Sequence, residues 1–552
     1  MKIKNLIKFA LAIFFVNITT SFANQQIFDD INPLKGLKED FLSEFSLVDE
    51  SSEKFIKLFH GKSFKQINEF LENLPVKNTD EVIQNLIYEI LSSNKSFDRN
   101  FINIEQDKMI FKTLINKLFD TGRLNQIELI YSQTNQLENN SFILMKMIEG
   151  NLLRNRHGEA CKIVQKVNQD PELFGKIMII CNIINSKYDE AKLGLQLLKE
   201  QNQPGDIFFI DLAFSLMSEN DISDSDDLKK NLDKIKQLNP IIMSSLQFAD
   251  ISPNFEQIEN LTTSGLLFIL SNPSVDTELK IYCSEILVKQ GRISVEMLSE
   301  AYQLARFDKK ELENAEKLYK SLSPIRARPL LYQSIVKDNK PESKYRKIIS
   351  LLEISVNDDL FSIISRLIFD LVDFDSYIGN QKESILISKM YQSKGDFVAS
   401  REILSKFLNT DESYVRKLSI DISELIENGS FNNALMEENL KYIAEKSTES
   451  INLEKIIMVL IQNVNLNQSY LDDLFKISIN ENIKSSDVQN LFLANKLSQE
   501  GDYFNSLSLI FNIIKNKNFL QLNLIQSYSI LIILKNLGLS EEFKNLSSRI
   551  LL

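Results

Sequence analysis

Apolar residues recur along this chain with the spacing of amphipathic helices. Phe111, Leu114 and Leu118 follow one another at three- and four-residue intervals, which places them on one face of a helix. The same spacing recurs within residues 363–371 and 456–464. Sustained alternation of apolar and polar residues, the mark of a half-buried strand, is hard to find. The pattern therefore predicts an all-α chain of about 30 helices, each roughly 10 to 17 residues long.

Proline residues mark the starts of several predicted helices. Six of them precede a segment with helical apolar spacing: Pro171, Pro204, Pro240, Pro273, Pro324 and Pro341. Proline suits the first turn of a helix, where its missing N–H leaves no hydrogen bond unmade. The clearest such segments predict helices at 277–290 and 295–306. With 15 Gly and 10 Pro in 552 residues, turn-rich β folds and Gly-rich nucleotide folds are disfavoured.

Seven short turns separate pairs of predicted helices. Gly and Asn permit the left-handed backbone conformation that ends a helix. An aromatic residue two positions later can pack over the bend, and a small residue five positions later lets the second helix approach the first. Within each half of the chain neighbouring turns are roughly 31 to 37 residues apart, except that the gap between Gly429 and Gly501 is about twice as long. The predicted turn residues are Gly122, Asn155, Ser186, Gly395, Gly429, Gly501 and Gly538.

The turn from Gly395 through Phe397 to Ser400, and its counterpart from Gly501 through Tyr503, resemble one known repeat. Their spacing is similar to the bend between the two helices of the tetratricopeptide repeat, whose period is about 34 residues. The resemblance covers about half of the chain. It implies a right-handed superhelical α-solenoid of antiparallel helix hairpins with an extended concave face. The repeat's usual Trp is absent, so no peptide-binding residues are carried over.

Period and composition predict four parts in the chain. Residues 1–23 are a signal peptide, and residues 24–240 form an N-terminal helical repeat array. Residues 241–345 form an aperiodic helical middle segment, because six of the ten prolines gather there or at its edge. Residues 346–552 form a C-terminal repeat array similar to tetratricopeptide repeats.

The predicted signal peptide has three lysines by position 8, an eight-residue apolar stretch at 9–16, and small residues at Ser21 and Ala23. This layout is typical of a secretory signal cut ahead of Asn24. The alternative is a retained anchor, but a membrane span needs roughly 20 apolar residues. The sequence therefore predicts an exported, soluble, periplasmic protein without a membrane span after cleavage.

The net charge of −12 bears on the choice of partner. Nucleic-acid binding depends on clustered Lys and Arg, and an acidic surface repels phosphate backbones. The nearest basic cluster combines residues 326–328 with 344–347, and it reads as ordinary solvated helix surface. We expect no nucleic-acid partner.

The three cysteines are Cys161, Cys181 and Cys283. A chain reversal near residue 169 would place Cys161 and Cys181 nearly level on two antiparallel helices, where a disulfide could form. The alternative is a pair of buried free thiols in an apolar helix interface.

Candidate catalytic residues are sparse. Trp is absent, and the two histidines are His60, at the predicted end of a helix, and His157, in a turn position suited to packing. The acidic stretch Asp221–Asp227 lacks the Gly and the final Glu of a calcium loop, so we interpret it as a solvated loop before a helix. Motifs for serine, zinc or phosphate chemistry are missing. We expect no catalytic residues, no metal site and no cofactor.

The sequence predicts a non-catalytic periplasmic scaffold or adaptor that binds proteins or peptides of the cell envelope, in its assembly or maintenance. Repeat arrays present long surfaces for such partners. One alternative is an exported enzyme that acts on glycans or peptidoglycan through paired carboxylates in a helical cavity. A permanent subunit of an outer-membrane complex is another.

Overall fold

A computed structural model defines the architecture in segments between residues 54 and 552. Within them lie 27 α-helices and three short 3-10 helices, and these segments contain no strand, which confirms the all-α prediction. The predicted signal 1–23, Pro204, Gly429 and residues 221–225 lie outside the described residues. The structure describes residues 54–55, 57–77, 80–92, 104–133, 141–166, 171–201, 206–217, 226–372, 374, 377–407, 411–428, 456, 459, 462–463, 485–515 and 517–552.

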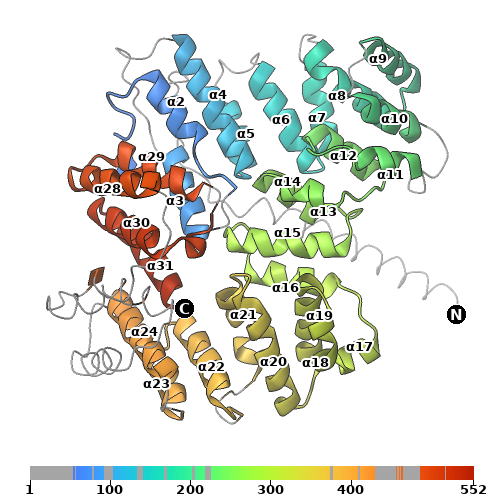
Figure 1. Ribbon diagram of the computed structural model, residues 1–552. Coiled ribbons are helices and arrows are strands. Elements are labelled where there is room, and N and C mark those ends of the chain that lie inside the picture. Colours follow the sequence, from blue (N-terminus) through green and yellow to red (C-terminus); the bar gives the residue numbers. More distant parts are fainter. Residues whose placement is uncertain are drawn as a thin grey trace. The chain divides into compact units, whose positions relative to one another are not determined.

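The chain forms two compact units (Figure 1). Unit 1 contains the described residues up to Glu72 together with Tyr88–Cys283. Unit 2 contains Asn73–Ile87 and Ser284–Leu552. The passage from unit 1 to unit 2 after Cys283 falls inside the segment 241–345. The divisions at 240 and 345 stay predictions.

The helices of unit 1 are mostly short. They are α2 (Phe64–Glu72), α4 (Ile104–Asp120), α5 (Leu124–Gln133), α6 (Ser141–Leu153), α7 (His157–Lys166), α8 (Pro171–Ile184), α9 (Tyr188–Glu200), α10 (Ile207–Leu216), α11 (Asp226–Leu232), α12 (Pro240–Phe248), α13 (Phe255–Glu259) and α14 (Thr263–Ser271). Two further helices, α3 (Glu81–Ser92) and α15 (Thr277–Lys289), supply residues to both units.

Unit 2 holds the remaining elements. They are α16 (Val295–Leu304), α17 (Lys309–Glu313), α18 (Ala315–Leu318), η4 (Tyr319–Ser321), α19 (Pro324–Lys337), α20 (Pro341–Val356), α21 (Phe361–Ile368), η5 (Phe369–Leu371), α22 (Gln381–Ser393), α23 (Phe397–Ser405), α24 (Asp411–Asn428), α28 (Ser485–Gln499), α29 (Tyr503–Ile514), η6 (Phe519–Gln521), α30 (Leu524–Asn536) and α31 (Ser540–Leu551). The helices predicted at 277–290 and 295–306 correspond to α15 and α16.

Six of the seven predicted turn residues have the left-handed conformation that their role requires. The φ angles are 75° at Gly122, 59° at Asn155, 58° at Ser186, 77° at Gly395, 75° at Gly501 and 71° at Gly538. In each case the next helix begins two residues later. The two helices of each pair pack against each other: α4 with α5, α6 with α7, α8 with α9, α22 with α23, α28 with α29 and α30 with α31.

The same pair of hydrogen bonds closes each of these turns. At Gly395, the residue's own N–H bonds to Gln392 O at 2.9 Å, and the N–H of Asp396 bonds to Tyr391 O at 3.0 Å. This is the Schellman motif, which satisfies the last carbonyl groups of a helix. The bonds at Gly501 have the same pattern. A short bend of this kind leaves the two helices side by side.

The positions after each turn behave partly as predicted. The small residues Ala160, Ala191, Ser400 and Ser506 are fully buried. Ser400 Oγ lies 2.9 Å from Ser388 Oγ on the first helix of its hairpin, so the small side chain does permit a close approach. Among the aromatic residues, Phe397 is buried, but Tyr188 is 42% exposed. The prediction that the aromatic residue packs over the bend is therefore wrong for Tyr188.

Four further described residues outside the predicted hairpin turns have a left-handed φ: Gly61, Asp250, Gly291 and Asp359. The N–H groups of Asp359 and Leu360 make the same two bonds, to Val356 O and Ser355 O, and α21 begins at Phe361. The hairpin of α20 and α21 therefore shares the geometry of the predicted hairpins, although Asp is a weaker signal than Gly for this conformation.

The hydrophobic core continues from one hairpin to the next. Ile385 of α22, Phe397 and Leu404 of α23, and Ile420 of α24 form one buried cluster. Each hairpin thus buries its apolar face against its neighbour as well as within itself, as stacked helical repeats do. The helices pair in a way that is compatible with an α-solenoid.

The turn geometry predicts the effect of replacing Gly501 with Ala. A β-carbon there meets no atom within 4 Å, so the cost comes from the backbone alone. An L-residue at this φ is strained by about 1 kcal/mol, and Gly501→Ala should lower the free energy of unfolding by that amount. Urea denaturation measures it.

Gly379→Ala provides the matched control in unit 2. Gly379 has no left-handed φ, and its β-carbon would be in ordinary contact, 3.7 Å from Glu383 Oε2. We expect a change within about 0.5 kcal/mol. Equal losses at positions 379 and 501 would contradict the assigned role of the turn.

Candidate functional site

His157 and the unpaired cysteine, Cys283, lie in packed surroundings. His157 packs its ring 4.4 Å from that of Phe248, and its Nε2 lies 3.0 Å from Ser244 Oγ. Burial lowers the pKa of His157 to about 4, which leaves the ring neutral near pH 7. The thiol of Cys283 is fully buried, and burial raises its pKa. The half-buried His157 ring therefore packs between Phe248, which is 39% exposed, and the buried Ser244.

His60 is exposed and lies in a turn, so the predicted helix end at this residue is wrong. Gly61 does have the left-handed conformation, with φ 67°, and α2 begins at Phe64. In the described part of the chain, no group of three or more His, Cys, Asp or Glu residues could hold a metal ion.

A buried ionic cluster occupies the interior of unit 2 around Arg328 of α19. Its Nε lies 2.7 Å from Glu285 Oε1 and its Nη2 lies 2.5 Å from Glu285 Oε2, so the two side chains form a bidentate pair. The Tyr302 hydroxyl donates to Glu285 Oε1 at 2.9 Å, and Arg328 Nη1 lies 2.5 Å from Asp358 Oδ2. Burial alone would lower the pKa of Arg328, but Glu285 outweighs it and raises the pKa.

A second ionic cluster joins distant parts of unit 2. Arg549 of α31 lies between two carboxylates: its Nη1 is 2.8 Å from Asp80 Oδ2 and its Nη2 is 3.1 Å from Asp359 Oδ2. Asn518 also donates to Asp359 Oδ2, at 2.8 Å. Asp80 has no exposed surface, and burial raises its pKa against the opposing charge of Arg549. This cluster fixes the segment 73–87 to the last helix.

These clusters bear on the alternative that paired carboxylates act on a glycan. In each cluster one acid, Glu285 or Asp80, is buried against its arginine, whereas the other, Asp358 or Asp359, is 42% or 23% exposed. Asp421 is likewise buried and bonds to Arg401 Nε at 2.8 Å. The buried acids of these clusters thus have partners within unit 2.

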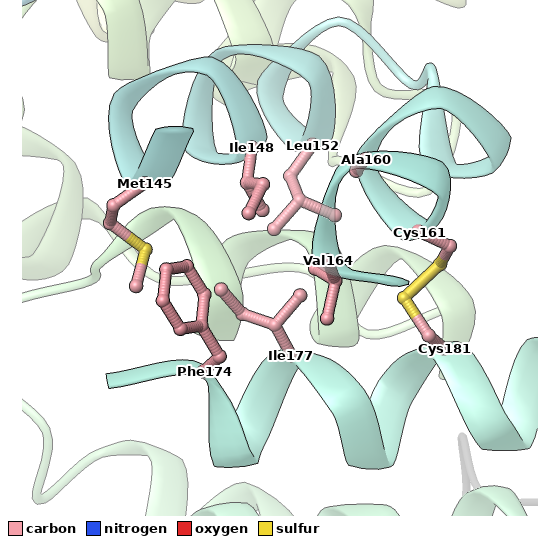
Figure 2. Packing of buried hydrophobic residues seen from close by; sticks show 9 residues of the cluster. All are labelled: Met145, Ile148, Leu152, Ala160, Cys161, Val164, Phe174, Ile177 and Cys181. Atoms are coloured by element: carbon pink, nitrogen blue, oxygen red, sulfur yellow. A yellow bond between two sulfur atoms is a disulfide. The ribbon is translucent and has the colours of Figure 1, made fainter. Parts of the chain in front are cut away.

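The structure bonds Cys161 to Cys181 through a disulfide, with the two Cα atoms 5.6 Å apart. Cys161 lies on α7 and Cys181 on α8, so the bond crosses between successive hairpins. Figure 2 shows it at one edge of a buried cluster that includes Val164, Phe174 and Ile177. The disulfide therefore links α7 to α8 across an interface that is otherwise formed by apolar side chains.

Exposed apolar side chains concentrate on α9 and α10. On α9, Leu193 is 59% exposed and Leu197 is 55% exposed, one helical turn apart. On α10, Ile207 and Phe214 are 58% and 43% exposed, and they are two turns apart on one face. We call these four residues the α9–α10 apolar residues. Large apolar groups with this exposure, repeated on neighbouring helices, are typical of surfaces that contact other molecules.

Sequence reasoning missed the α9–α10 apolar residues. No role was predicted for residues 193–198, and the buried residues of α9 are Ala191 and Leu195. The sequence did contain one indication of this exposure, because α9 carries more Leu residues than one buried face of a helix can hold.

Comparison with known proteins identifies no relative: no family model matches the chain, and no curated protein matches it. The site must therefore be interpreted from its own geometry. Within the described residues, none of the helices combines the length and apolar character needed to cross a bilayer.

The Arg328 cluster predicts a large effect for Arg328→Met. Removing the guanidinium leaves Glu285 buried without its counter-charge, which should cost about 3–5 kcal/mol in the free energy of unfolding. The double variant Arg328→Met/Glu285→Leu should recover most of this loss. Urea denaturation of the full chain measures both.

Arg346→Met is the control, because the Arg346 side chain is 52% exposed in its pairs with Glu342 and Glu316. An exposed pair contributes at most about 1 kcal/mol. If the Arg328 variant lost no more stability than the Arg346 variant, the buried cluster would not be a stabilising element.

The disulfide predicts one free thiol, that of Cys283, in the denatured and unreduced protein, against three after reduction. Cys161→Ser should lower the free energy of unfolding by about 3 kcal/mol, because the bond closes a loop of roughly 20 residues. Thiol titration and urea denaturation test these values. Three free thiols without reductant would show that the pair is not oxidised.

Proposed function

We propose that this protein is a non-catalytic, periplasmic scaffold or adaptor that binds other proteins in cell-envelope assembly or maintenance. The observation that carries the proposal is the exposure of the α9–α10 apolar residues. Leu193, Leu197 and Ile207 each leave more than half of the side chain in water, although the chain has a continuous core elsewhere. A partner that covers these residues would gain hydrophobic free energy.

The helix hairpins support this proposal because repeated hairpins present extended surfaces. Their turn geometry supports the proposal that the hairpins are similar to tetratricopeptide repeats and are arranged as a right-handed superhelix. Arrays of this type bind extended peptides or protein faces rather than small substrates. The proposed ligand class is therefore proteins or peptides of the envelope, without nucleic acid or cofactor.

Export to the periplasm rests on the signal-like segment 1–23, and the disulfide supports it. Disulfides persist in oxidising compartments and are rare in a reducing cytosol. The acidic balance, with 75 Asp and Glu against 63 Lys and Arg, favours protein partners over phosphate backbones.

Site-specific photo-crosslinking in whole cells tests the proposal. A photoreactive phenylalanine analogue at position 193 should yield one high-mass adduct with an envelope protein, identified by mass spectrometry in the periplasmic fraction. Leu197→Glu should reduce the yield of that adduct several-fold, because a charge in a desolvated contact is costly. The analogue at Lys192, an exposed polar neighbour, is the control.

Two results would overturn the proposal. One is equal adduct yield at positions 192 and 193, which would indicate non-specific contact. The other is release of muropeptides from isolated peptidoglycan by the purified protein, which would indicate an enzyme. Recovery of the protein only from the cytoplasm would reject the periplasmic location.

A further inference from the structure

Arg416 of α24 is a buried cation that has no anionic partner among the described residues. Its surface is 5% exposed. Nη1 donates to the carbonyl oxygen of Leu551 at 2.8 Å, but Nε and Nη2 are covered and have no hydrogen-bond partner. Burial lowers the pKa of Arg416 to about 9, since no neighbouring carboxylate opposes the effect.

The other buried arginines show what Arg416 lacks. Three arginines are buried among the described residues: Arg154, Arg328 and Arg416. Arg154 Nη1 bonds to Glu128 at 3.0 Å, and Arg328 forms its bidentate pair with Glu285. A buried guanidinium without a counter-ion costs several kcal/mol, so the fold normally supplies one. Within the part of the chain that the structure describes, the hydrogen bond of Arg416 goes to the Leu551 carbonyl at the end of α31.

A second cation lies near Arg416. Lys389 of α22 is partly exposed, and no hydrogen bond or ion pair joins it to another described residue. Burial lowers its pKa to about 8, the positive charge of Arg416 lowers it too, and the exposed Glu412 opposes both effects. Two cations close enough to repel each other create a local positive potential inside an acidic protein.

Neutral polar groups complete the setting. Gln392 lies one helical turn from Lys389. Its Nε2 donates to Ser423 Oγ at 2.6 Å, and its Oε1 has no hydrogen-bond partner. Ser419 donates its hydroxyl to Leu551 O at 3.0 Å. Gln392 and Ser419 share the Leu551 carbonyl with Arg416, so α22 and α24 each place a neutral polar group beside the end of α31.

We propose that Arg416 and Lys389 form a binding site for a small oxyanion. The free Nε–H and Nη2–H of a guanidinium point in the same direction and match two oxygens of a phosphate or carboxylate. In this proposal the ammonium of Lys389, the partly exposed member of the pair, supplies a third donor. The site does not depend on the proposed scaffold function.

Titration of the full chain with inorganic phosphate tests this site. At constant ionic strength, isothermal calorimetry should show saturable binding of one anion, and phosphate should raise the melting temperature relative to chloride. Acetate under the same conditions separates a phosphate site from a carboxylate site, and saturable binding of either anion supports the proposal. Lys389→Met should weaken binding at least about tenfold.

Lys382→Met is the matched control, because Lys382 lies on the same helix but is paired with Glu353 at 2.8 Å. It should leave the affinity unchanged. Arg416→Met should abolish binding and should also be at least as stable as the wild type in phosphate-free buffer, since it removes an uncompensated buried charge.

Three results would overturn the proposal. The first is absence of saturable binding by both anions, and the second is unchanged affinity in Lys389→Met. The third is binding of a hexaglutamate peptide without any response to phosphate or acetate, which would assign the cations to a protein partner. If Arg416→Met does not fold, the comparison between the Lys389 and Lys382 variants still decides the outcome.

Discussion

The left-handed residue at the end of a helix is the constraint on which the rest of the structure depends. One residue with positive φ, followed by a single intervening residue, reverses the chain so that the next helix must lie beside the last. The Schellman bonds satisfy carbonyl groups that would otherwise need another partner. Because the bend is short, the facing side chains must be small, as at Ser388 and Ser400, and the apolar faces of the hairpin must meet its neighbours.

Local turns alone would leave the ends of unit 2 unconnected, and the arginine clusters provide the long-range links. Arg328 joins α15, α19 and the turn before α21, while Arg549 joins the segment 73–87 to α31. A bidentate pair between buried groups has one defined geometry, whereas apolar side chains can pack in many geometries. In unit 2 the hydrophobic core therefore provides most of the driving force, and the ionic clusters select which elements meet.

Much of the fold could be predicted from the sequence, because helical period and turn chemistry are local properties. Six described turns, including the non-glycine Asn155 and Ser186, have the predicted conformation. The turns at Asp359 and Asp250 were not predicted, because Asp is usually a helix cap or a solvated residue and does not by itself indicate a left-handed backbone conformation. The pairing of Cys161 with Cys181 could be proposed from hairpin register but not decided, since side-chain direction depends on packing.

The candidate sites were much less predictable. With 75 acidic residues, no local pattern shows that Glu285 belongs to Arg328, which is 43 positions away. Leu193 is exposed and Arg416 lacks a counter-ion because of which residues do not lie beside them. Those neighbours are set by how the helices assemble, so the local sequence does not show them.

The contacts of the segment 73–87 have a consequence for the order of folding. Asn73 accepts a hydrogen bond from Lys515, 442 positions later in the chain, and Asp80 pairs with Arg549. A chain that is synthesised from its N-terminus must hold this segment without its native neighbours until nearly all the remaining residues have emerged. Hairpins in the interior of the sequence can form early because their contacts are local. We therefore expect unit 2 to be completed only after the interior hairpins have formed, and an incomplete chain to expose this segment to chaperones or proteases.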